Sequence, residues 1–156
     1  MKESQLNDIS SQLTIALDKV QDPGNMGTII RTADWFGIHN IVCSSDSVDI
    51  YNPKVIQATM GSFFRVNIVY TDLKKFFSNN SELAVCGALL DGENIYKKQL
   101  TTEGTVLLMG NESKGIAEEL LPFVTEKIKI PSYGKAESLN VATATAIICA
   151  EIKRNY

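Results

Sequence analysis

Short apolar runs alternate with amphipathic stretches along the whole chain. The runs with the hydrophobicity of buried strands predict β-strands at residues 12–20, 39–44, 64–70, 82–90, 105–110 and 126–131. Helical spacing and helix-start signals predict helices at residues 26–36, 52–61, 72–79, 116–124 and 138–155. Alternating strands and helices, with several strands apolar throughout, are typical of a parallel sheet covered on both faces. The pattern therefore predicts an α/β domain with a mostly parallel sheet and helices on both faces.

Local signals mark where several of these helices begin and end. Asn25 precedes the first apolar-periodic stretch and is expected to be its N-cap. Pro53 and Gly61 bracket the second helix, because proline suits the first helical position and glycine the end. Asp72 is placed to begin the third helix.

The last predicted helix has almost no polar face before Glu151. Its apolar positions are Leu139, Val141, Ala142, Ala144, Ala146, Ile147, Ile148, Ala150 and Ile152. A helix that is apolar all round is usually buried all round, and the sheet can cover only one side. We therefore expect a homodimer with this helix at the interface. The alternative is that its alanines simply tolerate exposure.

The length of 156 residues fits a single domain with a sizeable core. The first dozen residues are polar and weakly patterned, so we expect residues 1–12 to be a tail or linker remnant and residues 13–156 to form the domain. The amino terminus lacks the apolar core of a signal peptide, and no run approaches the ~20 residues that span a bilayer. We expect a cytoplasmic protein without membrane segments.

A formal net charge of −3 does not indicate a nucleic-acid binder, although a local basic patch can act under an acidic total. The pairs Lys74–Lys75 and Lys97–Lys98 are candidates for such a patch. Solvated surface is the simpler interpretation of both pairs.

The three cysteines, Cys43, Cys86 and Cys149, each lie inside an apolar run. Their odd number argues against a disulfide framework, and no two have the spacing of metal ligands. We expect buried free thiols and no metal site. The single histidine, His39, lies between a helix and a strand and is expected to be structural, so the usual general base is missing.

Three segments that follow strands are rich in Gly, Asn and Ser: residues 22–31, 107–116 and 128–142. Such residues let a backbone approach a ligand closely and offer short donors and acceptors. Ligands of open α/β sheets bind beyond the carboxyl ends of the strands, so we expect these loops to converge there. None contains the phosphate-loop or G-x-G-x-x-G fingerprint, which disfavours an ordinary nucleotide-binding enzyme.

The loops carry N-x-G-x-x-x-R from Asn25 to Arg31, G-N-E-x-x-G from Gly110 to Gly115, and I-P-x-x-G-x-x-x-S-L-N-V-A from Ile130 to Ala142. In order and spacing they resemble the three signature motifs of the SpoU (TrmH-like) RNA ribose 2′-O-methyltransferase family of the SPOUT superfamily. The resemblance extends over residues 13–153. One such motif alone is weakly specific, but the three together are highly specific.

The resemblance implies both a fold and a cofactor. The fold is an α/β domain whose C-terminal segment forms a deep trefoil knot, although general topology rules argue against knots. The cofactor is S-adenosyl-L-methionine, held by the second and third loops with its adenine in an apolar crevice. By position, the cofactor contacts are Leu90, Met109, Gly110, Ile130, Leu139, Asn140 and Ala142. The family works as a dimer, which agrees with the apolar last helix.

The activity implied is methyl transfer from the cofactor to a ribose 2′-hydroxyl of structured RNA, either rRNA or tRNA. The catalytic residues carried over by position are Arg31, Asn25, Glu112, Ser138 and Asn140. The donor is already activated, so the enzyme must align the reacting atoms and stabilise charge that grows on the oxygen. A guanidinium can do this and hold a phosphate, but only about one in a million is deprotonated at pH 7. We therefore expect Arg31 to act electrostatically, and the proton acceptor stays open.

The other candidate catalytic residues have expected structural or positioning roles. Asn25 is expected to orient Arg31 or the ribose. Glu112 either pairs with Arg31 or holds loop amides, and Ser138 is placed to cap the last helix. Asn140, inside an apolar helix start, is expected to be buried and therefore to need a partner.

Two other functions remain open at this point. One is a catalytically weak knotted domain that binds RNA or the cofactor, including a catalytic domain separated from an N-terminal RNA-binding domain, which many relatives carry. The other is the ordinary nucleotide-binding α/β enzyme that the missing glycine fingerprints disfavour. The motifs define neither the RNA nor the nucleotide that is modified.

Overall fold

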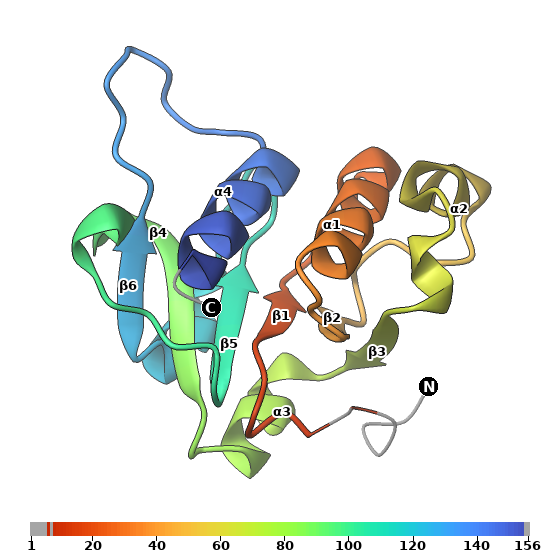
Figure 1. Cartoon of the computed structure of the whole chain (residues 1–156), viewed down its shortest axis with the longest axis horizontal. Coiled ribbons are helices and arrows are strands. Elements are labelled where there is room, and N and C mark those ends of the chain that lie inside the picture. Colours follow the sequence, from red (N-terminus) through yellow and green to blue (C-terminus); the bar gives the residue numbers. More distant parts are fainter. Residues whose placement is uncertain (1–5, 7, 155–156) are drawn as a thin grey trace.

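A six-stranded sheet forms the centre of the molecule (Figure 1). The structure is a computed structural model that describes residue 6 and residues 8–154. The strands are β1 (Thr14–Leu17), β2 (Asn40–Ser44), β3 (Asn67–Thr71), β4 (Ala84–Asn94), β5 (Thr105–Met109) and β6 (Glu126–Lys129). Every pair of neighbours is parallel, in the order β3-β2-β1-β5-β4-β6. The predicted parallel α/β sheet is confirmed.

Four α-helices and three short 3₁₀ helices connect the strands among the described residues. The α-helices are α1 (Pro23–Trp35), α2 (Pro53–Thr59), α3 (Leu73–Asn79) and α4 (Val141–Lys153). The 3₁₀ helices are η2 (Ser62–Phe64), η3 (Ile95–Lys97) and η4 (Glu118–Phe123). The α-helix predicted at residues 116–124 is wrong, because only η4 forms there. Pro122 lies inside this segment, where it lacks an N–H and clashes with the preceding turn of an α-helix.

Helix α1 begins earlier than predicted, and Asn25 is not its N-cap. Pro23 occupies the first helical turn, and Asp22 is the cap, its Oδ1 accepting a hydrogen bond from the backbone N–H of Asn25 at 2.8 Å. Proline is suited to this position because its missing N–H would have no helical partner. The side chain of Asn25 therefore takes no part in capping α1 and is available for other contacts.

Helix α4 begins later than predicted, and Ser138 is not its cap. Asn140 is the N-cap, and its Oδ1 accepts hydrogen bonds from the backbone N–H groups of Ala142 at 2.9 Å and Thr143 at 3.1 Å. Asparagine is among the best N-cap residues because its short side-chain oxygen reaches these donors. Residues 138–140 therefore belong to the loop, and the predicted end at residue 155 lies outside the described residues.

The strands separate two apolar clusters, one on each face of the sheet. In β1, Ile15 and Leu17 belong to one cluster and Ala16 to the other, as the alternation of side chains along a strand requires. Helices α1, α2 and α4 contribute to the first cluster, and α3 and η4 to the second. Figure 1 shows α1 and α4 standing side by side on the near face. Helices thus cover both faces, as predicted.

The order of the strands creates a switch point between β1 and β5. From β1 the chain adds β2 and β3 on one side, while β4 and β5 lie on the other side. Connections on the two sides of this point leave the sheet toward opposite faces, which opens a crevice beyond the carboxyl ends of the strands. The loops after β1 and β5 are therefore neighbours at the place where α/β sheets bind ligands.

Gly27, from the first motif, is required for packing between helices. A Cβ added there would lie 2.4 Å from the Cβ of Ala58 and 2.8 Å from the carbonyl oxygen of Val55. Both distances are too short for any side chain, so α2 can approach α1 only because position 27 is glycine. This close contact fixes α1, which carries Asn25 and Arg31.

The predicted buried free thiols are confirmed for all three cysteines. Burial raises the pKa of Cys86 to about 11 and that of Cys149 to about 12, and it raises the pKa of Cys43 further. A thiol is nucleophilic as its thiolate, so these side chains are unreactive at neutral pH.

Carboxylates engage one lysine of each pair that the sequence singled out. Lys74 Nζ lies 3.6 Å from a carboxylate oxygen of Glu119. Lys98 pairs with both Glu93 and Glu126. The interpretation of these lysines as ordinary surface residues is therefore favoured over a basic patch.

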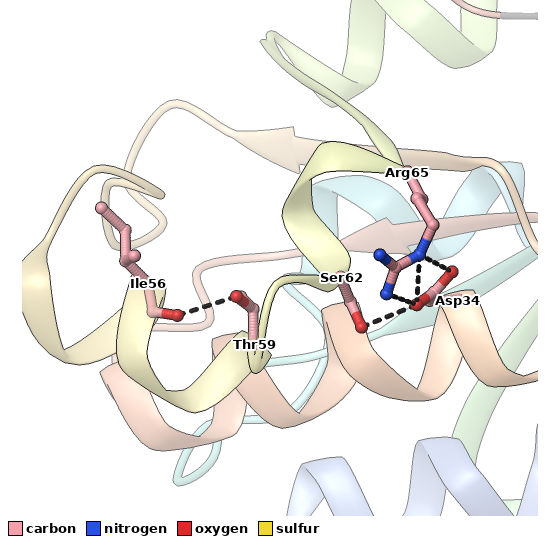
Figure 2. A network of polar contacts seen from close by, with 5 residues as sticks. All are labelled: Asp34, Ile56, Thr59, Ser62 and Arg65. Atoms are coloured by element: carbon pink, nitrogen blue, oxygen red, sulfur yellow. Dashed lines mark hydrogen bonds and ion pairs between the residues drawn. The ribbon is translucent and has the colours of Figure 1, made fainter.

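A polar network ties the end of α1 to η2 (Figure 2). Arg65 Nη2 and Ser62 Oγ donate to Asp34 Oδ2 at 2.6 and 2.7 Å, and Arg65 Nε contacts both carboxylate oxygens at 3.0 Å. Hydrogen bonds from Arg65 and then Ser62 lower the pKa of Asp34. The Arg65 side chain is 60% exposed, so solvent screens much of this attraction.

We predict that Asp34→Asn lowers the free energy of unfolding by about 1 kcal/mol at pH 7, because it removes a charged acceptor of three donors. The stabilisation by Asp34 is fully present above its unfolded-state pKa of about 3.9 and is lost as the pH falls through its lower folded-state pKa. Urea unfolding of the two proteins at pH 7 and at pH about 2.5 should show a difference that shrinks in acid.

Asp46→Asn is the matched control, because Asp46 is exposed and has no hydrogen bond or ion pair among the described residues. It should change the free energy of unfolding by less than about 0.5 kcal/mol. An Asp34→Asn effect that stays constant across this pH range would contradict the assignment.

Candidate active site

Hydrogen bonds join the three predicted loops at the carboxyl ends of the strands. Asn111 Nδ2, in the loop after β5, donates to the carbonyl oxygen of Lys19, in the loop after β1, at 2.7 Å. Asn140 Nδ2, at the start of α4, donates to Asn25 Oδ1 on α1 at 2.8 Å. The expected convergence of the loops is confirmed.

Glu112 is the centre of this arrangement. Its Oε1 accepts hydrogen bonds from the backbone N–H of Asp22 at 3.1 Å and from Asn25 Nδ2 at 3.2 Å. Its Oε2 accepts from Asn111 Nδ2 at 3.3 Å and from the backbone N–H of Gln21 at 3.4 Å. A carboxylate has about four lone-pair sites, so Glu112 is saturated by its own protein. Of the two expected roles, it holds loop amides.

The neighbours of Asn25 and Asn140 determine how both side-chain amides are oriented. Asn140 Oδ1 caps α4, so the amino group of Asn140 must point away from the helix, toward Asn25. Asn25 accepts that donor with Oδ1 and presents Nδ2 to Glu112, which can only accept. The direction of each hydrogen bond thus follows from the start of α4. Each amide keeps a second N–H for another acceptor.

The loop after β5 folds back on itself as a tight turn. Asn111 and Gly115 exchange two backbone hydrogen bonds of 3.0 Å, and Asn111 Oδ1 accepts from the N–H groups of Ser113 and Lys114. Gly115 has φ +70°, and a Cβ on Gly110 would lie 2.1 Å from the carbonyl carbon of Gly115. Both motif glycines are therefore required by the backbone that presents Glu112.

Arg31 is exposed on α1, beyond Asn25. Among the described residues it makes no hydrogen bond and no ion pair. Neither the contact expected with Asn25 nor the ion pair considered with Glu112 is present. The guanidinium of Arg31 is thus a charged group without a partner among the described residues.

Two residues of the third loop differ from what the sequence predicts. Ser138 is exposed and makes no hydrogen bond with any described residue, so its predicted capping role passes to Asn140. Asn140 is exposed rather than buried. It still has the partner that was expected for it, the side chain of Asn25.

The residues expected to contact a cofactor fall into two groups. Met109, Gly110 and Ala142 are buried, and Ile130 is half-buried against the main core. Leu90 and Leu139, by contrast, are 78% and 49% exposed. Leu90 lies in a break of the β4 ladder, because Ala88 and Glu93 both pair with Ile128. The two leucines therefore leave apolar surface exposed to solvent.

The backbone of the third loop is open. Between residues 131 and 139 the only hydrogen bond to a described residue is that from Ser132 Oγ to the carbonyl oxygen of Gly134, at 3.4 Å. Figure 1 shows this segment rising above the sheet between β6 and α4. Its unpaired N–H and C=O groups can bind the polar edge of a ring such as adenine, while leucine side chains contact the faces of the ring.

Sequence reasoning missed Asp22 and Asn111 as parts of this arrangement. A signal for each was present: Asp22 directly precedes a proline, and Asn111 directly precedes Glu112 within the second motif. Lys19 was also missed. Its positive φ of 56° leaves no mark in the sequence, because lysine rarely adopts this conformation.

The described residues contain neither a metal cluster nor a membrane-spanning helix. No group of three or more His, Cys, Asp and Glu side chains in the described residues could hold a metal ion. Within the same part of the chain, no helix has the length and hydrophobicity needed to cross a membrane.

Comparisons with known proteins point to one protein family. The SpoU rRNA Methylase family matches residues 12–150. The 23S rRNA (guanosine(2553)-2′-O)-methyltransferase RlmP of Bacillus subtilis is 34% identical over 146 residues, which are 92% of this chain and 59% of that protein.

Solved structures resemble the whole fold. The structure of a TrmH-family protein from Porphyromonas gingivalis aligns with a TM-score of 0.89 and 41% identity over 99% of this chain and 64% of the other. An AdoMet-bound rRNA methyltransferase from Sinorhizobium meliloti aligns with a TM-score of 0.87 and 36% identity over 92% of this chain and 56% of the other.

The chain spans less than two thirds of the length of each of these three relatives. The family match nevertheless includes all three loops and the network that joins them. The resemblance found in the motifs is thereby confirmed, and the chain belongs to the SpoU rRNA methylase family.

Proposed function

We propose that this chain is an S-adenosylmethionine-dependent methyltransferase that acts on a ribose 2′-hydroxyl in structured rRNA or tRNA. The observation that carries the proposal is the network of Glu112, Asn25 and Asn140, which joins the loops of all three motifs. The names of the Bacillus subtilis and Sinorhizobium meliloti relatives support the activity and the cofactor. A catalytically weak binding domain is the less favoured alternative, because the motif residues that this chemistry needs are all present.

The cofactor would lie beside Leu90, Ile130 and Leu139, with its adenine edge on the backbone of residues 131–139. The exposure of the two leucines and the unpaired backbone of this loop fit such a group. Met109, Gly110, Asn140 and Ala142 are the remaining proposed contacts. When bound, the cofactor supplies an activated methyl group on a sulfonium.

Arg31 would act on the RNA. Its guanidinium is exposed and has no partner among the described residues, so no internal ion pair has to be broken before it binds a phosphate. It can hold a phosphate oxygen with two parallel hydrogen bonds and direct a further donor toward the 2′-oxygen. Donors placed where negative charge develops are a large contribution to catalysis.

Glu112, Asn25 and Asn140 would position groups rather than move protons. Glu112 already accepts four hydrogen bonds, which leaves no lone pair directed at a substrate hydroxyl. The second N–H of each asparagine is free to bind the ribose, in an orientation that the start of α4 determines. Ser138, exposed beside them, is the remaining proposed catalytic residue, and the proton acceptor stays open.

The C-terminal segment is proposed to form the trefoil knot implied by the family. Helix α4 packs in the same core as Ile95 of η3, and Leu100, in the connection from η3 to β5, packs against that core. Helix α4 also contacts η3, where this connection begins, and in a trefoil knot α4 would pass through the loop that the connection makes. Such threading is rare, so the packing of α4 is the feature that supports it.

The outer side of α4 supports the proposed homodimer. Thr143 and Ala150 are exposed and Ala146 and Ile147 half-exposed, and helical spacing puts them on one stripe. The side chains of this stripe are mostly small and almost all apolar, which suits close packing against a second copy of the chain. We propose that α4 forms the dimer interface.

Binding of the cofactor is the direct test of the proposed function. Calorimetric titration of the purified chain with S-adenosylmethionine, repeated with S-adenosylhomocysteine, should give micromolar affinity with one site per subunit. Leu139→Asp should weaken both affinities at least about tenfold, because it places a charge against an apolar ring. Leu121→Asp, a half-buried position on η4, is the control. No binding by the folded chain would contradict the proposal.

Arg31→Gln should lower kcat by about 10²- to 10³-fold, because the variant loses a positive group near the developing oxyanion. Arg31→Lys should recover part of the loss, since it keeps the charge but not the planar fork. Transfer of tritiated methyl groups to unmodified 23S rRNA and tRNA transcripts measures the rates. Lys54→Gln, an exposed lysine of α2, is the control. A fully active Arg31→Gln enzyme across the pH range would exclude both proposed roles.

Ala150→Glu should convert the dimer to a monomer, because it places a charge in an apolar interface. In sedimentation the unmodified chain should have twice the subunit mass of 17.2 kDa, and the variant only that mass. Gln57→Glu adds the same charge on exposed α2 and should leave the dimer intact. A monomeric unmodified chain would refute the interface.

A further inference from the structure

A cavity of about 310 Å³ lies between the loop after β1 and the loop after β5. Its volume is at the lower end of the range for small-molecule sites. Its lining is mostly polar and includes Asp18, Lys19, Gln21, Glu112, Ser113 and Lys114. The cavity sits at the β1–β5 switch point, and it shares Glu112 with the network that binds Asn25.

Both carboxylates of the cavity accept hydrogen bonds from the protein itself. Asp18 is 2% exposed, and its Oδ2 accepts the backbone N–H of Ala117 at 2.7 Å. Glu112 accepts four donors. Lys19 and Lys114, in contrast, have no ion pair with any described residue. The groups that remain available to a ligand are therefore mostly cations and hydrogen-bond donors.

Lys19 is held in an unusual backbone conformation. Its φ is 56°, a region that glycine and asparagine adopt more readily than lysine. Its N–H donates to Ser44 Oγ at 2.8 Å, and its carbonyl oxygen accepts from Asn111 Nδ2 at 2.7 Å. Strained residues that the surroundings hold in this way cluster at ligand sites. Here the strained residue is one that lines the cavity.

We propose that this cavity is a subsite for an RNA backbone phosphate, next to the nucleotide that is methylated. Lys19 and Lys114 would neutralise the phosphate, and the side chains of Ser113 and Gln21 would donate to its oxygens or to the adjoining ribose. The position of the subsite rests on the proposed function, because Glu112 connects the cavity to the residues proposed to bind the reacting ribose. The ligand class is a polynucleotide phosphate rather than a free anion, since the cavity shares Glu112 with the network whose asparagines are proposed to bind the reacting ribose.

The test compares two double variants that remove the same charge. Lys19→Asn with Lys114→Gln removes the proposed contacts, and asparagine keeps the left-handed backbone at position 19. Lys54→Gln with Lys75→Gln removes two exposed lysines of α2 and α3 that have no ion pair with described residues. Fluorescence anisotropy with a labelled 12-nucleotide oligouridylate then gives the affinity of each protein over a range of salt concentrations.

Two phosphate contacts should contribute about 1.4 to the slope of log K against log salt concentration for a single strand. The cavity variant should lose about that much slope, and the control variant should keep the slope of the unmodified chain. Equal losses in the two variants would show general electrostatic attraction and would overturn the proposal. An unchanged slope in the cavity variant would overturn it as well.

Two further measurements locate the site and separate this proposal from the enzymatic one. Amide NMR signals of Ser113, Lys114 and Gly115 should shift with the oligouridylate, and inorganic phosphate at equal concentration should not reproduce the shifts. Saturation by inorganic phosphate with the same affinity would overturn the assignment to RNA. Calorimetry should give the same S-adenosylmethionine affinity for the cavity variant as for the unmodified chain. A chain that binds the oligouridylate here but not S-adenosylmethionine would refute the proposed function and leave the subsite standing.

Discussion

The amide of Asn140 determines the arrangement of the whole site. Its oxygen caps α4, which leaves its amino group directed at Asn25. Asn25 must then turn its own amino group toward Glu112. The Glu112 carboxylate also accepts hydrogen bonds from backbone N–H groups of the loop after β1. One helix start therefore orients side chains from three loops that are far apart in sequence. A change at any member would leave a donor or an acceptor unpaired, and such a group destabilises the loops when water cannot reach it.

The sheet makes this network possible by bringing the loops together. β1 and β5 are neighbours although many residues separate them, and their carboxyl ends meet at the switch point of the sheet. Tight backbone approaches then bring the elements within hydrogen-bonding distance. Gly27 lets α2 press on α1, and Gly110 lets the loop after β5 fold back at Gly115. The glycines of the motifs are thus required by the scaffold that positions the polar residues between them.

The cationic residues of the site share the lack of an ion-pair partner. Arg31, Lys19 and Lys114 lack ion-pair partners in the described chain, while the acidic groups Glu112 and Asp18 are occupied by internal donors. A chain with a net charge of −3 can in this way present positive charge at one place. In the proposed function, this arrangement would let the chain bind RNA without a strongly basic domain. It also shows why counting lysine pairs along the sequence was uninformative, since Lys74 and Lys98 are engaged elsewhere.

The sequence alone determined the parallel α/β sheet, the buried thiols and the three loops that converge, because these follow from local periodicity, burial and motif order. It assigned the cap of α1 to Asn25 and offered Ser138 as the alternative cap of α4, where Asp22 and Asn140 perform these roles. Neighbouring residues compete for one helix start, and local rules hardly separate them. Only the tertiary structure decided that Glu112 is saturated, that Leu90 lies in a ladder break and that Lys19 is strained. These features arise from contacts between segments distant in sequence, which no local pattern encodes.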